Sequence, residues 1–229
     1  MFDDQRNRLL AALDEAHDAY YRSVVFAGPS LHFHLRSLEA ARAQDFERFA
    51  EYLYAVLASW GMHRMGPGGS KMREFGEFQA SLRLVWPIAL QLRDKEPSSL
   101  TESDWNCLRK VFFEIRCMAS GTSLVGNSKV MAHLLPKLIP PVDRQYTLKF
   151  LFRHGQITNG TDVEWEKLLQ ILNGFFYPIA QSALFQDKAE EWLTQNERFK
   201  WDTSALKIVD NLVIGLSKTI RGEQVVPGA

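Results

Sequence analysis

The chain has 229 residues, of which 46% are hydrophobic and 24% are charged, a composition typical of a globular protein. Lysine and arginine together number 27, as do aspartate and glutamate, so the formal net charge is zero. This balance excludes a strongly basic nucleic-acid-binding chain and a highly charged disordered one.

The two cysteines, Cys107 and Cys117, are too few for a four-cysteine cluster or a structural zinc site. Ten residues apart on one expected helix, they lie too far from each other to form a disulfide. We therefore expect a reducing, cytoplasmic location and no cofactor. No apolar run is long enough to cross a membrane, and the N-terminus lacks the apolar core of a signal peptide.

Apolar residues recur at intervals of three and four along most of the chain, which is the period of an amphipathic helix. This pattern predicts helices over residues 3–26, 30–42, 46–60, 71–86, 102–119, 127–139, 143–152, 161–172 and from about residue 203 onward. No useful stretch alternates between apolar and polar residues, so no strand is expected. The sequence predicts an all-α fold with about ten helices in one compact body.

Start and stop signals mark several helix ends. Signals for a helix start, either a capping aspartate or the spacing of a capping box, occur at Asp45, at Thr101 with Asp104, and at Thr161 with Glu164. Pro87 should kink its helix or start a new one. We expect one domain over residues 1–221, made of N-terminal helices (1–44), a core (45–155) and C-terminal helices (156–221), followed by a flexible tail (222–229).

Charge is unevenly distributed along the chain. Between residues 105 and 160 the basic residues clearly outnumber the acidic ones, Glu114 and Asp143; the basic residues are Arg109, Lys110, Arg116, Lys129, Lys137, Arg144, Lys149 and Arg153. A basic face in this region could hold phosphates although the chain is neutral as a whole. Ordinary variation of surface charge explains the same pattern.

Residues 123–129 suggest an anion site. Gly126 follows Leu124-Val125 and precedes an expected helix, so a sharp turn there would present backbone N–H groups to an anion. Asn127, Ser128 and Lys129 would add two donors and a positive charge. The alternative is a plain connection between two helices, capped by Asn127 or Ser128. A P-loop is excluded because its first glycine and preceding strand are missing.

Asp143 is the residue that most clearly points to chemistry. Pro140 and Pro141 end the preceding helix, and Asp143 stands where the next one should begin. A carboxylate at a helix N-terminus accepts backbone N–H bonds and lies at the positive end of the helix dipole. Held in a cleft, it could stabilise a sugar cation or activate a water. The alternative is that Asp143 serves only as an N-cap.

Taken together, the segments LVGNSKVMAHLL and PPVDRQYT resemble the helix-hairpin-helix DNA glycosylase superfamily, with a partial likeness over residues 49–155. The resemblance implies that hairpin amides at Gly126 and Asn127 hold a DNA phosphate and that Asp143 acts on a flipped nucleotide. Ser128 occupies the position where bifunctional members carry a lysine, and Lys129 lies one place later. A monofunctional enzyme is therefore expected, with Asp143 and Ser128 as its catalytic candidates.

By the same resemblance, a glycine-rich loop over residues 61–71 looks like the loop that probes the duplex in that family. We expect its Arg64 and Lys71 to contact DNA, together with Lys129 and Arg144. The loop could equally be a plain connection between helices.

Two further candidates carry less weight. His32 and His34 would face apart on a helix and have no suitably spaced carboxylate, so no metal site is expected. Trp60, beside the loop, could stack on a base, although core packing is the usual role of a tryptophan.

The sequence thus predicts a DNA-binding, DNA-repair hydrolase that cleaves the N-glycosidic bond of a damaged or modified base. The alternative is a non-catalytic helical module that binds nucleic acid or a protein partner. The zero net charge favours this alternative.

Overall fold

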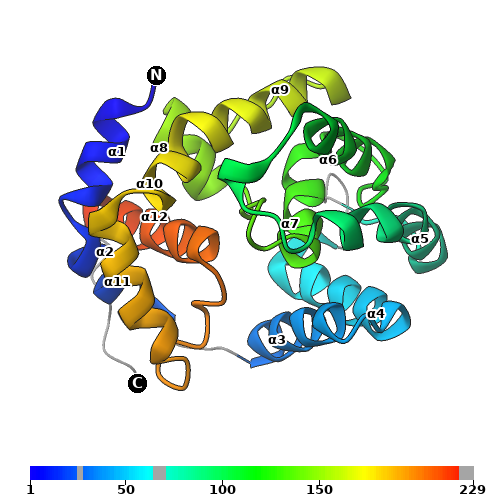
Figure 1. Ribbon diagram of the computed structural model, residues 1–229, viewed down its shortest axis with the longest axis horizontal. Coiled ribbons are helices and arrows are strands. Elements are labelled where there is room, and N and C mark those ends of the chain that lie inside the picture. The colour runs from blue at the N-terminus through cyan, green and yellow to red at the C-terminus, as the bar shows by residue number, and fades with distance from the viewer. Residues whose placement is uncertain (25–27, 64–70, 222–229) are drawn as a thin grey trace. The chain divides into compact units, whose positions relative to one another are not determined.

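The computed structural model describes residues 1–24, 28–63 and 71–221, and its regular elements are helices (Figure 1). An isolated antiparallel bridge between Met72 and Met118 is the one β-type pairing within these ranges. The expected all-α class is confirmed, while the expected tail lies outside the described residues. No single described helix is long and apolar enough to cross a membrane. The segments Thr161–Ala180 and Ala183–Thr194 reach that length and apolar character only when they are taken together, and they are bent by 76° at the short break between them.

The chain folds into two compact units, each drawn from segments that are distant in the sequence. The first unit comprises Met1–Ala27, Val142–Gln156 and Leu168–Ala229, and the second comprises Gly28–Pro141 and Ile157–Lys167. Of the expected limits, residue 44 lies inside the second unit, whereas residue 155 lies one residue before the end of the first-unit segment Val142–Gln156. The chain passes from the second unit into the first between Pro141 and Val142, one residue before Asp143.

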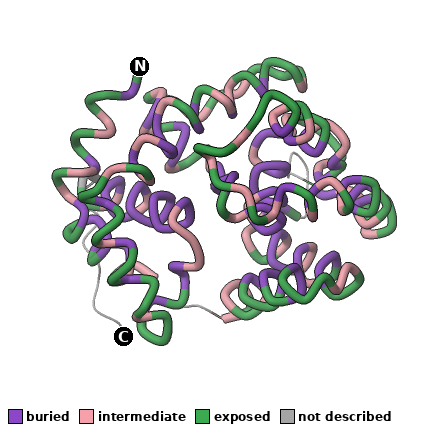
Figure 2. Tube along the Cα trace, viewed as in Figure 1, coloured by how far each residue is buried: buried purple, intermediate pink, exposed green. Residues whose placement is uncertain are grey.

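The first unit is built on two helices that pack closely, α2 (Leu13–Ser23) and α12 (Ala205–Arg221). Its other elements are α1 (Asp3–Leu10), η3 (Arg144–Leu148), α8 (Lys149–Phe152), η4 (Leu172–Phe176), α10 (Tyr177–Ala180) and α11 (Ala183–Thr194). Most of α12 is buried, as Figure 2 shows; its fully or almost fully buried apolar side chains are Leu206, Ile208, Val209, Leu212 and Val213. The helix expected from about residue 203 is confirmed.

The prediction of one continuous helix over residues 3–26 is wrong, because the helix is interrupted between Leu10, where α1 ends, and Leu13, where α2 begins. Phe2, directly before α1, is 2% exposed, and its ring meets Phe152 edge-on at 5.3 Å. The same ring lies against Gly174, whose backbone oxygen accepts a 2.6 Å hydrogen bond from Arg6 Nη1. These contacts hold α1 as a helix separate from α2. They involve residues far away in the sequence, so the spacing of apolar residues could not predict them.

The second unit contains α3 (Gly28–Arg42), α4 (Phe46–Leu57), η1 (Ala58–Met62), α5 (Phe75–Leu92), η2 (Pro97–Ser99), α6 (Glu102–Glu114) and α7 (Leu124–Leu134). Helix α9 (Thr161–Ile171) begins in this unit and ends in the first. Two expected caps are confirmed: Asp45 accepts from the backbone N–H of Arg48, and Thr101 and Asp104 form a reciprocal capping box. The Thr101 backbone N–H and the Lys95 ammonium lower the pKa of Asp104 to about 2.

Pro87 does not end its helix, because α5 continues through it to Leu92. A proline removes one backbone hydrogen bond, a cost that packing can outweigh. Val85 and Ala89, on either side of Pro87, are both buried. Packing of the two halves therefore keeps the helix continuous.

Candidate functional site

Asp143 occupies the helix start that the sequence predicts. Its backbone is extended, and its Oδ1 accepts hydrogen bonds from the backbone N–H groups of Gln145 at 2.6 Å and Tyr146 at 3.2 Å. The backbone N–H of Asp143 in turn donates to Thr147 Oγ1 at 3.2 Å. These bonds hold the half-buried carboxylate in one orientation in the first unit.

The turn that Asp143 starts is a π-helical one. The backbone N–H of Leu148 donates to the Asp143 carbonyl at 2.9 Å, a bond across five residues, before α8 continues as an α-helix. Single π-turns within helices are rare and occur frequently at functional sites. Arg144, in the same turn, is exposed and approaches the Gly155 carbonyl at 3.5 Å.

The prediction of a sharp turn at Gly126 is wrong. Helix α7 begins at Leu124, so Gly126 is its third residue, and its φ is not positive. A Cβ at this position would lie 3.1 Å from Met118 Cγ and 3.2 Å from Cys117 Sγ. Glycine here therefore allows α7 to pack closely on the side chains of the segment before it, and it does not mark a backbone turn.

The side chains that follow Gly126 are turned into the second unit. Asn127 is 2% exposed, and its Nδ2 donates to the carbonyls of Phe112 and Ile115 at 2.8 and 3.1 Å. Ser128 is fully buried and donates to the Val125 carbonyl at 3.2 Å. Lys129 is 8% exposed, with Nζ 5.5 Å from the centre of the Trp60 ring. Asn127, Ser128 and Lys129, which were expected to bind a phosphate, therefore contact other residues of the protein instead of facing the solvent.

The N-terminus of α7 already has an anion. The carboxylate of Glu164, 3% exposed, accepts a 2.6 Å hydrogen bond from the backbone N–H of Leu124. A carboxylate at this position is favoured by the helix dipole in the way a phosphate would be. Glu164 was expected to cap its own helix together with Thr161, and it caps α7 instead.

The packing around Gly126 leads to a test with thiol reagents. Burial raises the pKa of the Cys117 thiol to about 12, whereas Cys107 on α6 is half-buried. Because the thiolate is the reactive form, Cys117 should stay unreactive at pH 8. We expect about one fast-reacting thiol per native chain with a disulfide reagent, and about two in guanidinium. The variant Cys107→Ser should lose the fast phase, and equal rates for both thiols would contradict this packing.

The loop expected to probe DNA lies largely outside the described residues, and Arg64 is among those not described. Lys71, at its far end, is exposed, and its backbone carbonyl accepts from the backbone N–H of Ala119 at 3.0 Å. Lys71 and residues 126–129 belong to the second unit, whereas Asp143 and Arg144 belong to the first.

A buried pair of histidines in the second unit was missed from the sequence. His34 and His32 face apart as expected, but His34 Nδ1 lies 2.9 Å from Nε2 of His133 on α7. His133 Nδ1 lies 2.8 Å from the Lys129 carbonyl, so this nitrogen carries the proton. No group of three His, Cys, Asp or Glu side chains within the described ranges could hold a metal ion. The partners are 99 residues apart, and no local signal connects them.

A second pair, in the first unit, was also missed. His17 Nε2 lies 2.8 Å from Asp202 Oδ2, and both residues are almost completely buried. The His17 ring stacks on Trp192 at 4.0 Å and meets Phe199 edge-on at 4.6 Å. Aromatic rings thus enclose the pair, which makes it a structural link between α2 and the start of α12.

Comparisons with protein-family models, with curated proteins and with solved structures found no match to this chain. The likeness to helix-hairpin-helix DNA glycosylases therefore rests on the residues of this chain alone. It stays a prediction, with Asp143 as the residue best placed for it.

Proposed function

We propose that this chain binds DNA and cleaves the N-glycosidic bond of a damaged or modified base extruded from the duplex. The observation that carries the proposal is the half-buried Asp143 carboxylate, held by two backbone N–H groups at the start of a π-turn. An oriented carboxylate of this kind can stabilise the positive charge that develops on the sugar ring.

In the proposed reaction the bond between C1′ and the base nitrogen breaks, and the base leaves with the electron pair. The Asp143 carboxylate stabilises the resulting sugar cation, and a water molecule then adds its oxygen to C1′. One proton of this water passes to the departing base, and the other stays on the oxygen as part of the new hydroxyl group. No lysine attack on the sugar is needed, in agreement with the monofunctional enzyme expected from the sequence.

The proposal places the DNA contacts on exposed cations, because residues 126–129 are buried. Arg144 adjoins Asp143 in the first unit, and Lys71 lies on the surface of the second. Each such cation that contacts a phosphate adds to binding and to its salt dependence.

A panel of duplexes that carry different damaged or modified bases tests the proposal. For any base that is excised, we expect Asp143→Asn to lower the single-turnover rate roughly a hundredfold or more, because the developing cation loses its counter-charge. Asp45→Asn is the matched control, since Asp45 also caps a helix through its side chain. Asparagine is an equally good cap, so this variant should keep the wild-type rate. Unchanged excision by Asp143→Asn would refute the proposed role.

A second candidate is a non-catalytic helical module that binds nucleic acid or a protein partner. It is favoured by the burial of Asn127 and Ser128 and by the Glu164 carboxylate at the N-terminus of α7. In the same panel this candidate predicts duplex binding at low salt with no excision of any base, or no duplex binding at all.

A further inference from the structure

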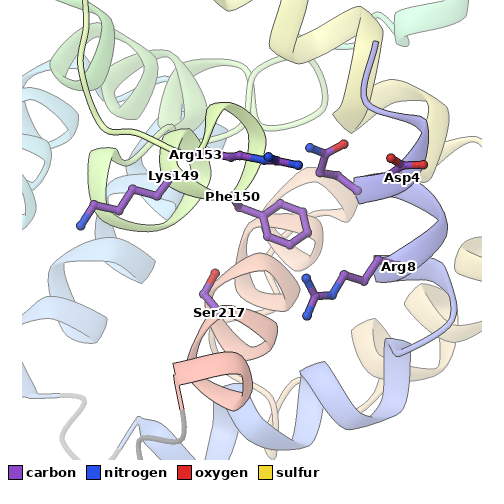
Figure 3. A pocket seen from close by; sticks show the side chains of 7 residues that line it. Asp4, Arg8, Lys149, Phe150, Arg153 and Ser217 are labelled. Atoms are coloured by element: carbon purple, nitrogen blue, oxygen red, sulfur yellow. The ribbon is translucent and has the colours of Figure 1, made fainter.

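A cavity in the first unit, separate from the Asp143 turn, has the composition of an anion site. Its volume is about 340 Å³, and it is lined by residues from α1, from α8 and the position directly after it, and from α12: Asp4, Gln5, Arg8, Lys149, Phe150, Arg153 and Ser217 (Figure 3). This volume is at the lower end of the range for small-molecule sites, so the cavity suits one compact ligand.

The cations of this cavity are not neutralised by the protein. Arg8, Lys149 and Arg153 form no ion pair with any carboxylate in the described part of the chain, and Lys149 Nζ donates to the neutral Gln145 Oε1 at 2.8 Å. Some exposed cations elsewhere do have such partners, as in the pairs Arg83–Glu47, Arg109–Asp162 and Lys137–Glu96. With Asp4 as the one acidic lining residue, the cavity favours an anionic ligand.

Ser217 supplies a second and independent sign of a ligand. It is 8% exposed, and its hydroxyl has no hydrogen-bond partner among the residues described. Other buried or half-buried helical serines bond back to their own helix, as Ser23, Ser37 and Ser81 do at 2.7–2.8 Å. The Ser217 oxygen is not among the fully buried side-chain atoms that lack a partner, so it is open to the cavity, where it can contact a bound molecule.

Phe150 gives the cavity an aromatic surface between its two arginines. Figure 3 shows the Phe150 ring between Arg153 and Arg8, while Lys149 points away toward the rim. The ring is steadied by Phe175, whose centroid is 5.8 Å away. Nucleobases stack on such rings with little dependence on their identity, and arginines bind phosphate oxygens through two parallel donors.

We propose that this cavity binds a nucleotide, with the phosphate held by Arg8, Arg153 and the Ser217 hydroxyl and the base against Phe150. The nucleotide is either a free mononucleotide or one unit of a single strand, because both present an anionic phosphate beside a base. The inference does not depend on the glycosylase proposal, since none of its residues is assigned a role in base excision.

Calorimetric titration of the full chain with dAMP, deoxyadenosine, inorganic phosphate and a short single-stranded oligodeoxyadenylate tests the proposal. We expect dAMP to bind roughly tenfold or more tightly than deoxyadenosine or phosphate alone, because only dAMP engages both halves of the site. Tighter binding of dAMP than of the oligonucleotide identifies a free nucleotide as the ligand, and the reverse order identifies a strand. Failure of both to bind below about 1 mM would overturn the inference.

Single variants assign the binding to this cavity. Arg8→Gln and Arg153→Gln should each weaken binding roughly tenfold or more through loss of a charge-assisted hydrogen bond, and Phe150→Leu several-fold through loss of stacking. Arg22→Gln is the matched control, because Arg22 is an exposed arginine of the same unit that does not line the cavity. Equal affinities for the Arg8, Arg153 and Arg22 variants would exclude this cavity as the binding site.

Two further variants separate the proposals. Asp4→Asn should strengthen binding several-fold, because it removes the one negative charge that faces the phosphate. A loss of affinity in this variant would contradict the placement of the phosphate. Asp143→Asn should bind dAMP as the wild type does, so a failure of base excision and a failure of nucleotide binding are told apart.

Discussion

Replacement of Gly215 by alanine is expected to lower the free energy of unfolding by about 3 kcal/mol or more. Gly215 lies in α12 where this helix crosses α2, and a Cβ there would lie 1.9 Å from the Ala16 carbonyl oxygen and 2.8 Å from the Tyr20 backbone nitrogen. Both are backbone atoms of a helix, so neither can rotate away as a side chain would. The two central helices of the first unit would have to move apart.

Gly76→Ala is the matched control for this prediction. Gly76 lies in the first turn of α5, and a Cβ there would meet no atom within 4 Å. Alanine should therefore leave the stability unchanged or raise it by less than about 1 kcal/mol, since it favours the helical backbone. Urea unfolding followed by circular dichroism measures both variants. A Gly215→Ala midpoint equal to that of the wild type would contradict the close packing of α2 and α12.

Glycines show what a single sequence can and cannot reveal about this fold. A glycine marks either a backbone turn or a close approach, and the same letter stands for both. Gly61 has a φ of 73°, as a turn requires, whereas Gly126 and Gly215 sit in regular helices against neighbouring atoms. The expected hairpin at Gly126 is wrong for this reason, because only the tertiary packing distinguishes the two uses.

Helix caps that use backbone groups within a few residues are the signals that the sequence predicts best. The caps at Asp45, Thr101 and Asp143 are all present, because each depends on backbone groups two or three positions further along. Glu164 has the same local spacing from Thr161, yet its carboxylate goes to Leu124, 40 residues away. A local pattern therefore predicts that a cap is possible, and the fold decides which helix receives it.

The two proposed sites also differ in whether the sequence could predict them. Asp143 could be found from the sequence because its prolines and its capping bonds are its immediate neighbours. The proposed nucleotide cavity could not, since Arg8, Phe150 and Ser217 come from three helices that are far apart along the chain. Only the packing of α1, α8 and α12 brings their side chains around one space.

A buried polar network in the first unit is the second place where a single substitution should have a large effect. Asp202 uses both carboxylate oxygens: Oδ2 pairs with His17 Nε2 at 2.8 Å, and Oδ1 accepts from Asn211 Nδ2 at 2.7 Å. Asn211 Oδ1 in turn accepts from Lys207, whose ammonium also pairs with Asp210 at 2.8 Å. The network ties α2 to the start of α12 inside the core.

We expect Asp202→Ala to lower the free energy of unfolding by about 3 kcal/mol, because buried donors on His17 and Asn211 lose their acceptor at about 1–3 kcal/mol each. Asp202→Asn should cost less, since its amide keeps one acceptor for Asn211 and the other tautomer of His17 can accept from its NH2 group. The control is Asp162→Ala, whose partner is Arg109 and whose side chain is 76% exposed. A surface pair of this kind contributes less than about 1 kcal/mol. Equal urea midpoints for Asp202→Ala and Asp162→Ala would show that the buried pair does not stabilise the first unit.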